Sequence, residues 1–168
     1  MRRVGSRYYK APELLVGFSF YDYAIDIFSA GCVLAGLLLQ REPFFRGRDN
    51  EDQLVRIACA LGTDGLHRFL RKYNVQLSAE LLAAVGKHNK KPWSSFLSAD
   101  SSSSTSASDK GHCSPSAAMQ SGFDLLERML CYDHQERITA KQALAHPFFD
   151  AVRDSVQLGC GDGHIPNA

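Results

Sequence analysis

The longest apolar run in the sequence, residues 21–41, constrains the fold more than any other feature. Its letters are YDYAIDIFSAGCVLAGLLLQR, and between Ile25 and Leu39 only Asp26 and Ser29 are polar. A helix that is apolar on every side is either buried in a core or lies in a membrane. A membrane span needs about 20 apolar residues, and the apolar part of this run, Ile25–Leu39, has only 15. We therefore expect a fully buried central helix on which the rest of the chain packs.

Asp26 is the most informative polar residue of this predicted helix. A buried carboxylate is costly unless it is paired or accepts several hydrogen bonds. Near the N-terminus of a helix it also meets the favourable end of the helix dipole. Asp26 therefore either caps its own helix or holds a neighbouring loop through that loop's backbone amides, and this stretch alone leaves both readings open.

Charge and cysteine usage exclude several classes of function. The formal net charge is +1, so no global field attracts nucleic acid, and the basic cluster Lys87–Lys91 is too small to change that. The five cysteines are odd in number and scattered, without a C-x-x-C pair, which predicts neither a disulfide framework nor a zinc site. The sequence shows no signal peptide and no lipidation motif. We expect neither a nucleic-acid nor a membrane partner.

Hydrophobic periodicity and capping residues predict helices along the rest of the chain and no confident strand. The expected helices are Glu13–Val16, one that is capped by Asp49 or Asn50 and runs to Leu61, Asp64–Lys72, Ala79–Val85, one through residues 123–130, and one capped by Thr139. Gln53 and Gln142 stand at capping-box positions relative to Asn50 and Thr139. A Ser-rich insert at about residues 98–118 lacks large apolar residues and periodicity, which predicts a disordered surface loop. We therefore predict an all-α domain over residues 1–150 and a flexible tail at residues 151–168.

Two motifs resemble the C-terminal lobe of eukaryotic protein kinases. Residues 11–13 read A-P-E, and residues 26–31, DIFSAG, are similar to the D-x-W-S-x-G start of helix F, with Phe28 for the usual Trp. Further stretches resemble the catalytic (alpha) subunit of casein kinase II, a CMGC-group kinase: VGSRYYKAPELL at 4–15, EPFF at 42–45, DN at 49–50, DQLVRIA at 52–58, LGT at 61–63, KYN at 72–74 and YDHQ at 132–135. The resemblance covers about residues 2–150 apart from the insert. It implies the helical C-terminal lobe of the kinase fold, stacked on a buried central helix.

The resemblance implies a serine/threonine kinase that uses ATP and Mg²⁺, acts on acidic protein substrates, and works in the cytoplasm and nucleus. However, the sequence contains no G-x-G-x-x-G, V-A-I-K, H-R-D or D-F-G motif. We therefore name no catalytic, cofactor-binding or metal-binding residue, and expect neither ATP nor Mg²⁺ to bind this chain. The alternative is a non-catalytic binding module or truncated pseudokinase that presents an acidic-peptide surface. The family's regulatory (beta) subunit docks mainly on the N-terminal lobe, so we do not expect it as a partner of these residues.

Four residues near the N-terminus are candidates for substrate binding. By resemblance, Arg3, Arg7 and Lys10 lie in the loop that receives the residues just after the phosphorylated Ser or Thr. Arginine offers a planar fork to a carboxylate or phosphate, and lysine offers a point charge. Ser6 corresponds to a hydroxyl that approaches the catalytic aspartate in the family. The alternative is that all four are ordinary solvated surface residues.

Glu13 and Arg137 form a second candidate group. In kinases the A-P-E glutamate pairs with an arginine that precedes the last helix, and Arg137 stands in that place. The resemblance therefore implies a structural pair that clamps the substrate loop to the helical lobe. The alternative is two unrelated surface charges.

Overall fold

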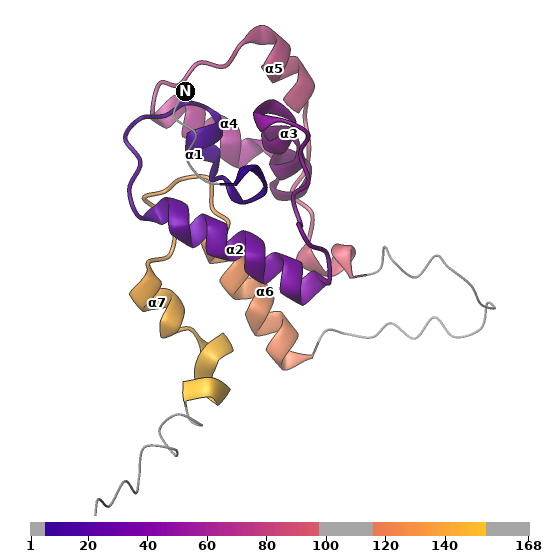
Figure 1. The fold of residues 1–168 in the computed structure, drawn as a ribbon, viewed down its shortest axis with the longest axis vertical. Helices are drawn as coiled ribbons and strands as arrows, with labels where there is room; N and C mark the ends of the chain where they lie inside the picture. Colours follow the sequence, from indigo (N-terminus) through magenta and orange to yellow (C-terminus); the bar gives the residue numbers. More distant parts are fainter. Residues whose placement is uncertain (1–5, 98–115, 154–168) are drawn as a thin grey trace, which may run out of the picture.

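The computed structural model describes residues 6–97 and 116–153, and every regular element within them is a helix (Figure 1). The α-helices are α1 (Pro12–Leu15), α2 (Ala24–Leu39), α3 (Asn50–Leu61), α4 (Thr63–Lys72), α5 (Ala79–Val85), α6 (Ala117–Met129) and α7 (Ala140–Leu144). Three 3₁₀ turns accompany them: η1 (Arg7–Tyr9), η2 (Trp93–Phe96) and η3 (Pro147–Phe149). The all-α prediction is confirmed for these residues.

Helix α2 lies across the middle of the fold, with α1, α3, α4 and α5 on one side and α6 and α7 on the other (Figure 1). Its inner face buries Phe28, Cys32 and Ala35. The approach to the end of α6 is close, because a Cβ atom at Gly31 would stand 2.9 Å from Leu130 Cδ2. A larger residue at this position would have to displace Leu130, so glycine sets the spacing of the two elements.

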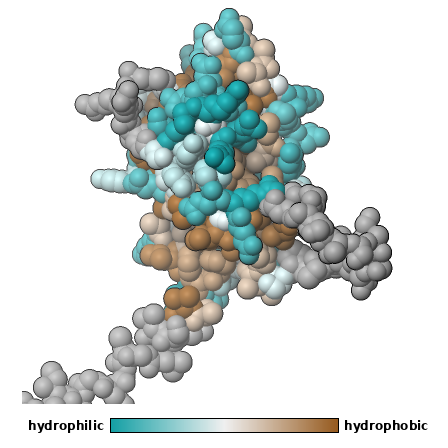
Figure 2. Space-filling model, turned by 45° about the vertical axis from the view of Figure 1, so that its right-hand side comes forward, coloured by the Kyte–Doolittle hydropathy of each residue, from teal (hydrophilic) through white to brown (hydrophobic). Residues whose placement is uncertain are grey.

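The opposite face of α2 is exposed, which contradicts the expectation of a fully buried helix. Tyr23, Ala30, Val33 and Leu37 recur at helical spacing along this face, and Tyr23 is 90% exposed and Leu37 65% exposed. We call these four residues the α2 stripe. The helix is apolar on every side, but the described residues pack against only part of its circumference. Figure 2 shows apolar residues gathered over the lower half of one face of the molecule, below a mainly hydrophilic upper half.

No described helix is both long enough and apolar enough to cross a bilayer.

Local capping explains where several helices begin. Ser78 Oγ accepts a hydrogen bond from Leu81 N at 3.1 Å and starts α5, and Thr139 forms the capping box that was expected at α7 with Gln142. Helix α3 is capped by Asp49, whose Oδ1 accepts from Asp52 N at 2.8 Å. These side chains satisfy backbone N–H groups that have no partner within the helix.

Two predicted boundaries differ from the structure. Helix α6 begins at Ala117 rather than near residue 123, because Ser116 Oγ accepts from Met119 N at 3.2 Å and caps it. The cap was hidden in the sequence by the serine run around it. Residues 151–153, predicted to be part of a flexible tail, are helical. The rest of the predicted insert and tail, residues 98–115 and 154–168, lies outside the described residues.

Candidate functional site

Glu13 and Arg137 come together in the core of the fold and form a bidentate ion pair. Arg137 Nη1 donates to Glu13 Oε1 at 2.8 Å, and Nη2 donates to Oε2 at 3.0 Å. Both side chains are 0% exposed. The parallel fork is the strongest geometry for an arginine–carboxylate contact, so the alternative of two unrelated surface charges is wrong. We call this pair the Glu13–Arg137 clamp.

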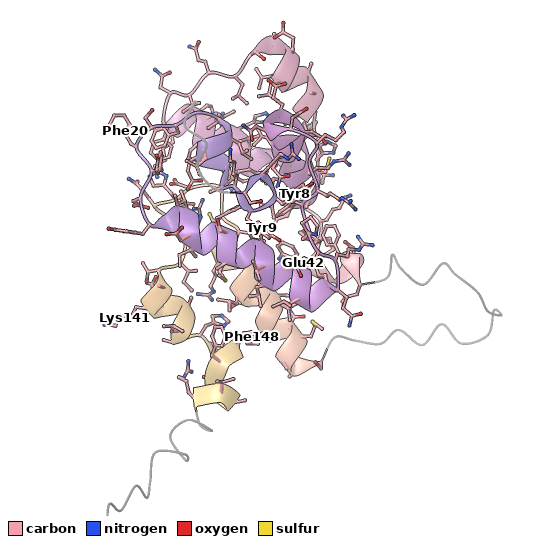
Figure 3. The ribbon with its side chains drawn as sticks, in the orientation of Figure 1. Tyr8, Tyr9, Phe20, Glu42, Lys141 and Phe148 are labelled. Carbon is pink, nitrogen blue, oxygen red and sulfur yellow. The ribbon has the colours of Figure 1, made fainter. Side chains whose placement is uncertain are left out.

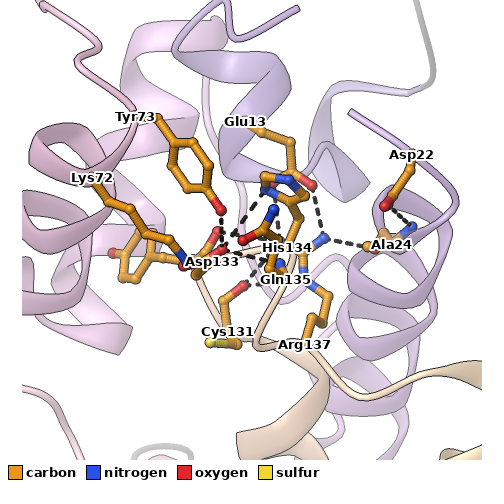
Figure 4. A network of polar contacts seen from close by, with 11 residues as sticks. Glu13, Asp22, Ala24, Lys72, Tyr73, Cys131, Asp133, His134, Gln135 and Arg137 are labelled. Carbon is orange, nitrogen blue, oxygen red and sulfur yellow. Dashed lines mark hydrogen bonds and ion pairs between the residues drawn. The ribbon is translucent and has the colours of Figure 1, made fainter. Parts of the chain in front are cut away.

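The remaining donors of Arg137 tie the clamp to other parts of the chain (Figure 4). Nη1 also donates to Ala24 O at 2.6 Å, at the start of α2, and Nε and Nη2 donate to Cys131 O at 3.1 and 2.9 Å. The guanidinium carbon lies 5.1 Å from the centre of the Phe28 ring. One arginine thus holds α1, the first turn of α2 and the loop after α6 in a fixed arrangement.

The predicted cations lie on a short segment just before α1, residues 6–10, which we call the basic loop. Ser6 is exposed, and its side chain makes no capping hydrogen bond to η1. Arg7 and Lys10 are half-buried. Arg7 Nη1 donates to Arg48 O, and Lys10 Nζ donates to Asn50 Oδ1 at 3.4 Å. The fourth candidate, Arg3, lies outside the described residues.

The basic loop is fastened to α3 by Gln53, which the sequence did not single out for this role. Gln53 is fully buried; its Nε2 donates to Tyr8 O at 3.1 Å and its Oε1 accepts from Gly47 N at 2.8 Å. The expected capping-box contact of Gln53 is therefore wrong, because the amide is used across the fold rather than within α3. The nearest signal was the D-Q-L motif at residues 52–54, which did not reveal the partners.

Helix α2 holds the same loop from the other side. Ser29 Oγ donates to Tyr9 O at 2.8 Å, and Tyr9 OH donates to Glu42 Oε1 at 3.4 Å. Figure 3 shows Tyr8 and Tyr9 next to each other above α2, with Glu42 beyond them toward the C-terminal end of that helix. With Gln53, these contacts fix the backbone on which Arg7 and Lys10 stand.

The charged groups near the basic loop include the Arg48–Asp52 pair and Glu42. Within the described part of the chain, neither Arg7 nor Lys10 forms an ion pair with a carboxylate. Arg48, next to Arg7, pairs with Asp52 at 3.3 Å. The hydrogen bond from the Arg48 backbone N–H lowers the pKa of Asp52, and the nearby arginines lower it further. Together these effects outweigh the desolvation of the carboxyl, which alone would raise its pKa. Asp52 is thus already paired with Arg48 and Arg56, and the charges of the basic loop remain open to an external anion.

Asp26 is exposed, so the expected buried carboxylate is not found. It does not cap its own helix either: Asp22 Oδ1 accepts from Ala24 N at 2.8 Å and serves the first turn of α2 instead. No described residue donates to the Asp26 side chain or pairs with it. The carboxylate stands on the same side of α2 as the α2 stripe, with both oxygens open to a partner.

A cavity of about 610 Å³ lies between α4, the segment before η2 and the loop after α6. Its wall includes Asp133, which accepts from Lys72 Nζ at 2.5 Å and from Tyr73 OH at 2.7 Å. Desolvation alone would raise the pKa of Asp133, but these hydrogen bonds outweigh it and lower the pKa. Lys90, a second cation of the wall, pairs with Glu127. Lys72 and Lys90 are therefore neutralised internally, whereas Arg68 of the same wall forms no ion pair with a described carboxylate.

The described residues supply no donor set for a metal ion: nowhere among them do three His, Cys, Asp or Glu side chains converge. Nucleotide phosphates in kinases are held by a glycine-rich loop and a strand lysine, and Mg²⁺ by an aspartate and an asparagine. None of these motifs occurs in the sequence. The residues present do not fit an ATP–Mg²⁺ complex.

In a comparison with protein-family models, residues 1–149 match the family described as protein kinase domain. The match includes the clamp and the basic loop.

Proposed function

The chain belongs to the protein kinase domain family, and on this premise we propose that it is the helical, substrate-binding lobe of a serine/threonine kinase of the casein kinase II type. Its role is to receive acidic protein substrates in the cytoplasm and nucleus. Phosphate transfer from ATP requires the family's phosphate- and magnesium-binding motifs, which these 168 residues lack. The chain alone therefore binds substrate without modifying it.

The observation that carries this proposal is the pair of cations on the basic loop. Arg7 and Lys10 sit on a backbone fixed by Gln53 and Ser29, and no described carboxylate neutralises them. A loop held in this way loses little conformational entropy on binding, which favours recognition of a charged peptide. The carboxylates of a substrate, placed just after the acceptor Ser or Thr, supply the missing counterions.

The exposed face of α2 supports the same proposal. The α2 stripe and Asp26 form a surface with apolar side chains and a carboxylate that has no described partner. We propose that the motif-bearing part of the kinase packs on this face, burying the stripe and supplying backbone donors to Asp26. The regulatory subunit of the casein kinase II family has no place in this proposal.

Peptide binding by the 168-residue chain tests the proposal. Fluorescence anisotropy compares a labelled Ser peptide carrying Asp and Glu after the Ser with a matched peptide carrying Asn and Gln. We expect tighter binding of the acidic peptide, with a preference that weakens as salt rises because exposed charges are screened. Equal affinity for both peptides would refute the assignment of the basic loop.

Variants locate the binding surface. Lys10→Gln should weaken binding of the acidic peptide by up to about fivefold, since an exposed ion pair contributes about 0.2–1 kcal/mol. Arg68→Gln is the matched control, because it removes one exposed positive charge from α4 and leaves the basic loop unchanged. If Arg68→Gln weakens binding as much as Lys10→Gln does, the attraction comes from net charge and not from the basic loop.

A further inference from the structure

Cys59 and His88 form a thiol–imidazole pair away from the basic loop. Cys59 Sγ and His88 Nε2 are 3.4 Å apart, within hydrogen-bonding distance for sulfur. Cys59 lies in the last turn of α3, and His88 lies in the segment between α5 and η2. Both residues are partly exposed, so a small reagent can reach the sulfur.

The backbone N–H and C=O groups of His88 form the hydrogen bonds that hold this residue in place. Thr63, which is fully buried, donates to His88 O from both its N and its Oγ1, at 3.0 and 3.3 Å. In return, His88 N donates to Thr63 Oγ1 at 3.2 Å. Three residues further on, Lys91 N donates to Ala60 O at 3.0 Å. The imidazole is therefore positioned beside Cys59 by contacts that do not involve its ring.

The other described cysteines lack such a partner. Burial raises the pKa of both the Cys32 and the Cys131 thiols, which keeps them protonated and inert. Reactive cysteines are those that lie beside a histidine or other cation in a partly exposed place. Cys59 alone among the described cysteines has a histidine ring at hydrogen-bonding distance, and the exposed side chains of Lys87 and Lys90 lie on the same segment as that histidine.

We propose that Cys59 is a reactive thiol, assisted by His88, that is modified by small-molecule disulfides. In the tautomer of His88 whose Nε2 carries no proton, the S–H of Cys59 donates to Nε2, and transfer of that proton gives a thiolate beside an imidazolium. The thiolate attacks one sulfur of the disulfide. A new S–S bond forms to Cys59, the old S–S bond breaks, and the second half of the reagent leaves as a thiolate with the electron pair.

The modification would place a group at the edge of the 610 Å³ cavity, because His88 is part of the cavity wall. Tyr132 stands at the same wall and donates to Gly62 O at 3.0 Å, next to Thr63. The site is independent of the substrate surface proposed above.

The test uses the 168-residue chain carrying Cys113→Ser and Cys160→Ser, so that only the described thiols remain. The probe is dipyridyl disulfide, a neutral reagent whose released thione is followed by absorbance, and the modified residue is identified by peptide mass spectrometry. We expect one fast equivalent per chain, on Cys59. The fast phase should disappear in Cys59→Ser and persist in Cys131→Ser; a fast phase that survives Cys59→Ser overturns the proposal.

His88→Gln separates assistance by the imidazole from an effect on folding. The backbone contacts to Thr63 remain in this variant. We expect Cys59 to react at about one-fifth of its original rate or more slowly still, because the proton acceptor is gone. Unfolding would act in the opposite direction, since it exposes Cys32 and speeds the reaction of every thiol. Lys87→Gln is the matched control: it removes a neighbouring charge and should change the rate little. An unchanged rate in His88→Gln, or an equal slowing in Lys87→Gln, overturns the role of the imidazole.

Discussion

Replacing Glu13 by alanine should destabilise the chain severely, because it leaves the Arg137 guanidinium buried without a counterion. Both side chains are 0% exposed, and the carboxylate accepts two of the arginine's hydrogen bonds. Removing one partner of a buried ion pair typically costs about 3–5 kcal/mol. Arg137 keeps the carbonyl acceptors of Ala24 and Cys131. We therefore expect Glu13→Ala to lower the free energy of unfolding by about 3 kcal/mol, at the lower end of that range.

Replacing the other partner of the clamp, Arg137, should lower the free energy of unfolding by more. Arg137→Ala leaves the Glu13 carboxylate with no described donor, frees the carbonyls of Ala24 and Cys131, and opens a void over Phe28. We expect a loss of roughly 4–5 kcal/mol. In the double variant neither charge is stranded, so its stability should be close to that of the worse single variant. The two losses would then fall short of additivity by about 3 kcal/mol.

Urea unfolding measures these losses. Trp93 is the sole tryptophan and is buried, so its fluorescence reports the transition alongside the helical circular dichroism. Arg128→Ala is the matched control, because Arg128 forms a half-exposed i,i+4 pair with Asp124 at 3.0 Å and should cost only about 0.3–0.5 kcal/mol. Additive losses for Glu13→Ala and Arg137→Ala would refute the coupling of the clamp, whatever their individual sizes.

Three further predictions concern other parts of the chain. The exposed α2 stripe predicts self-association, so Leu37→Lys should shift sedimentation equilibrium toward the monomer; an unchanged mass distribution would contradict this. The lowered pKa of Asp133 means that its contribution to stability is complete above the ordinary aspartate pKa of about 3.9 and is lost as the pH falls through the lower folded value. Asp133→Asn should therefore reduce the loss of stability at acidic pH, measured by urea unfolding at several pH values. An unchanged pH dependence would contradict this role of Asp133. Isothermal titration with Mg-ATP should give no binding heat; saturable binding would show a nucleotide site in this chain.

The helices could be predicted from the sequence where short-range patterns decide them. Ser78 and Thr139 act as caps in the structure because an N-cap needs only its own helix. Asp22 and Asp26 show the limit of the same approach. Both carboxylates lie near the start of α2, and local patterns do not distinguish which one reaches the first free N–H.

Contacts between distant segments could not be derived from local patterns. Gln53 sits at a position suited to a capping box, yet its amide joins Tyr8 to Gly47. The Glu13–Arg137 clamp was expected only because the motifs resembled a known family. The α2 stripe was missed for a related reason: hydrophobicity shows that a side chain favours burial but does not show whether a neighbour is present to bury it.

The clamp joins residues that are 124 positions apart, and this separation orders events during synthesis. Glu13 is synthesised before its counterion, which does not exist until translation has passed residue 137. Throughout that interval the Glu13 carboxylate, which is buried in the folded chain, is paired with water instead of Arg137. Until then the basic loop can contact α3 through Gln53, but α1 is not yet held by the Glu13–Arg137 clamp. A chain that stops short of residue 137 would thus keep the Gln53 and Ser29 contacts of the basic loop but lack the tie between α1 and the loop after α6.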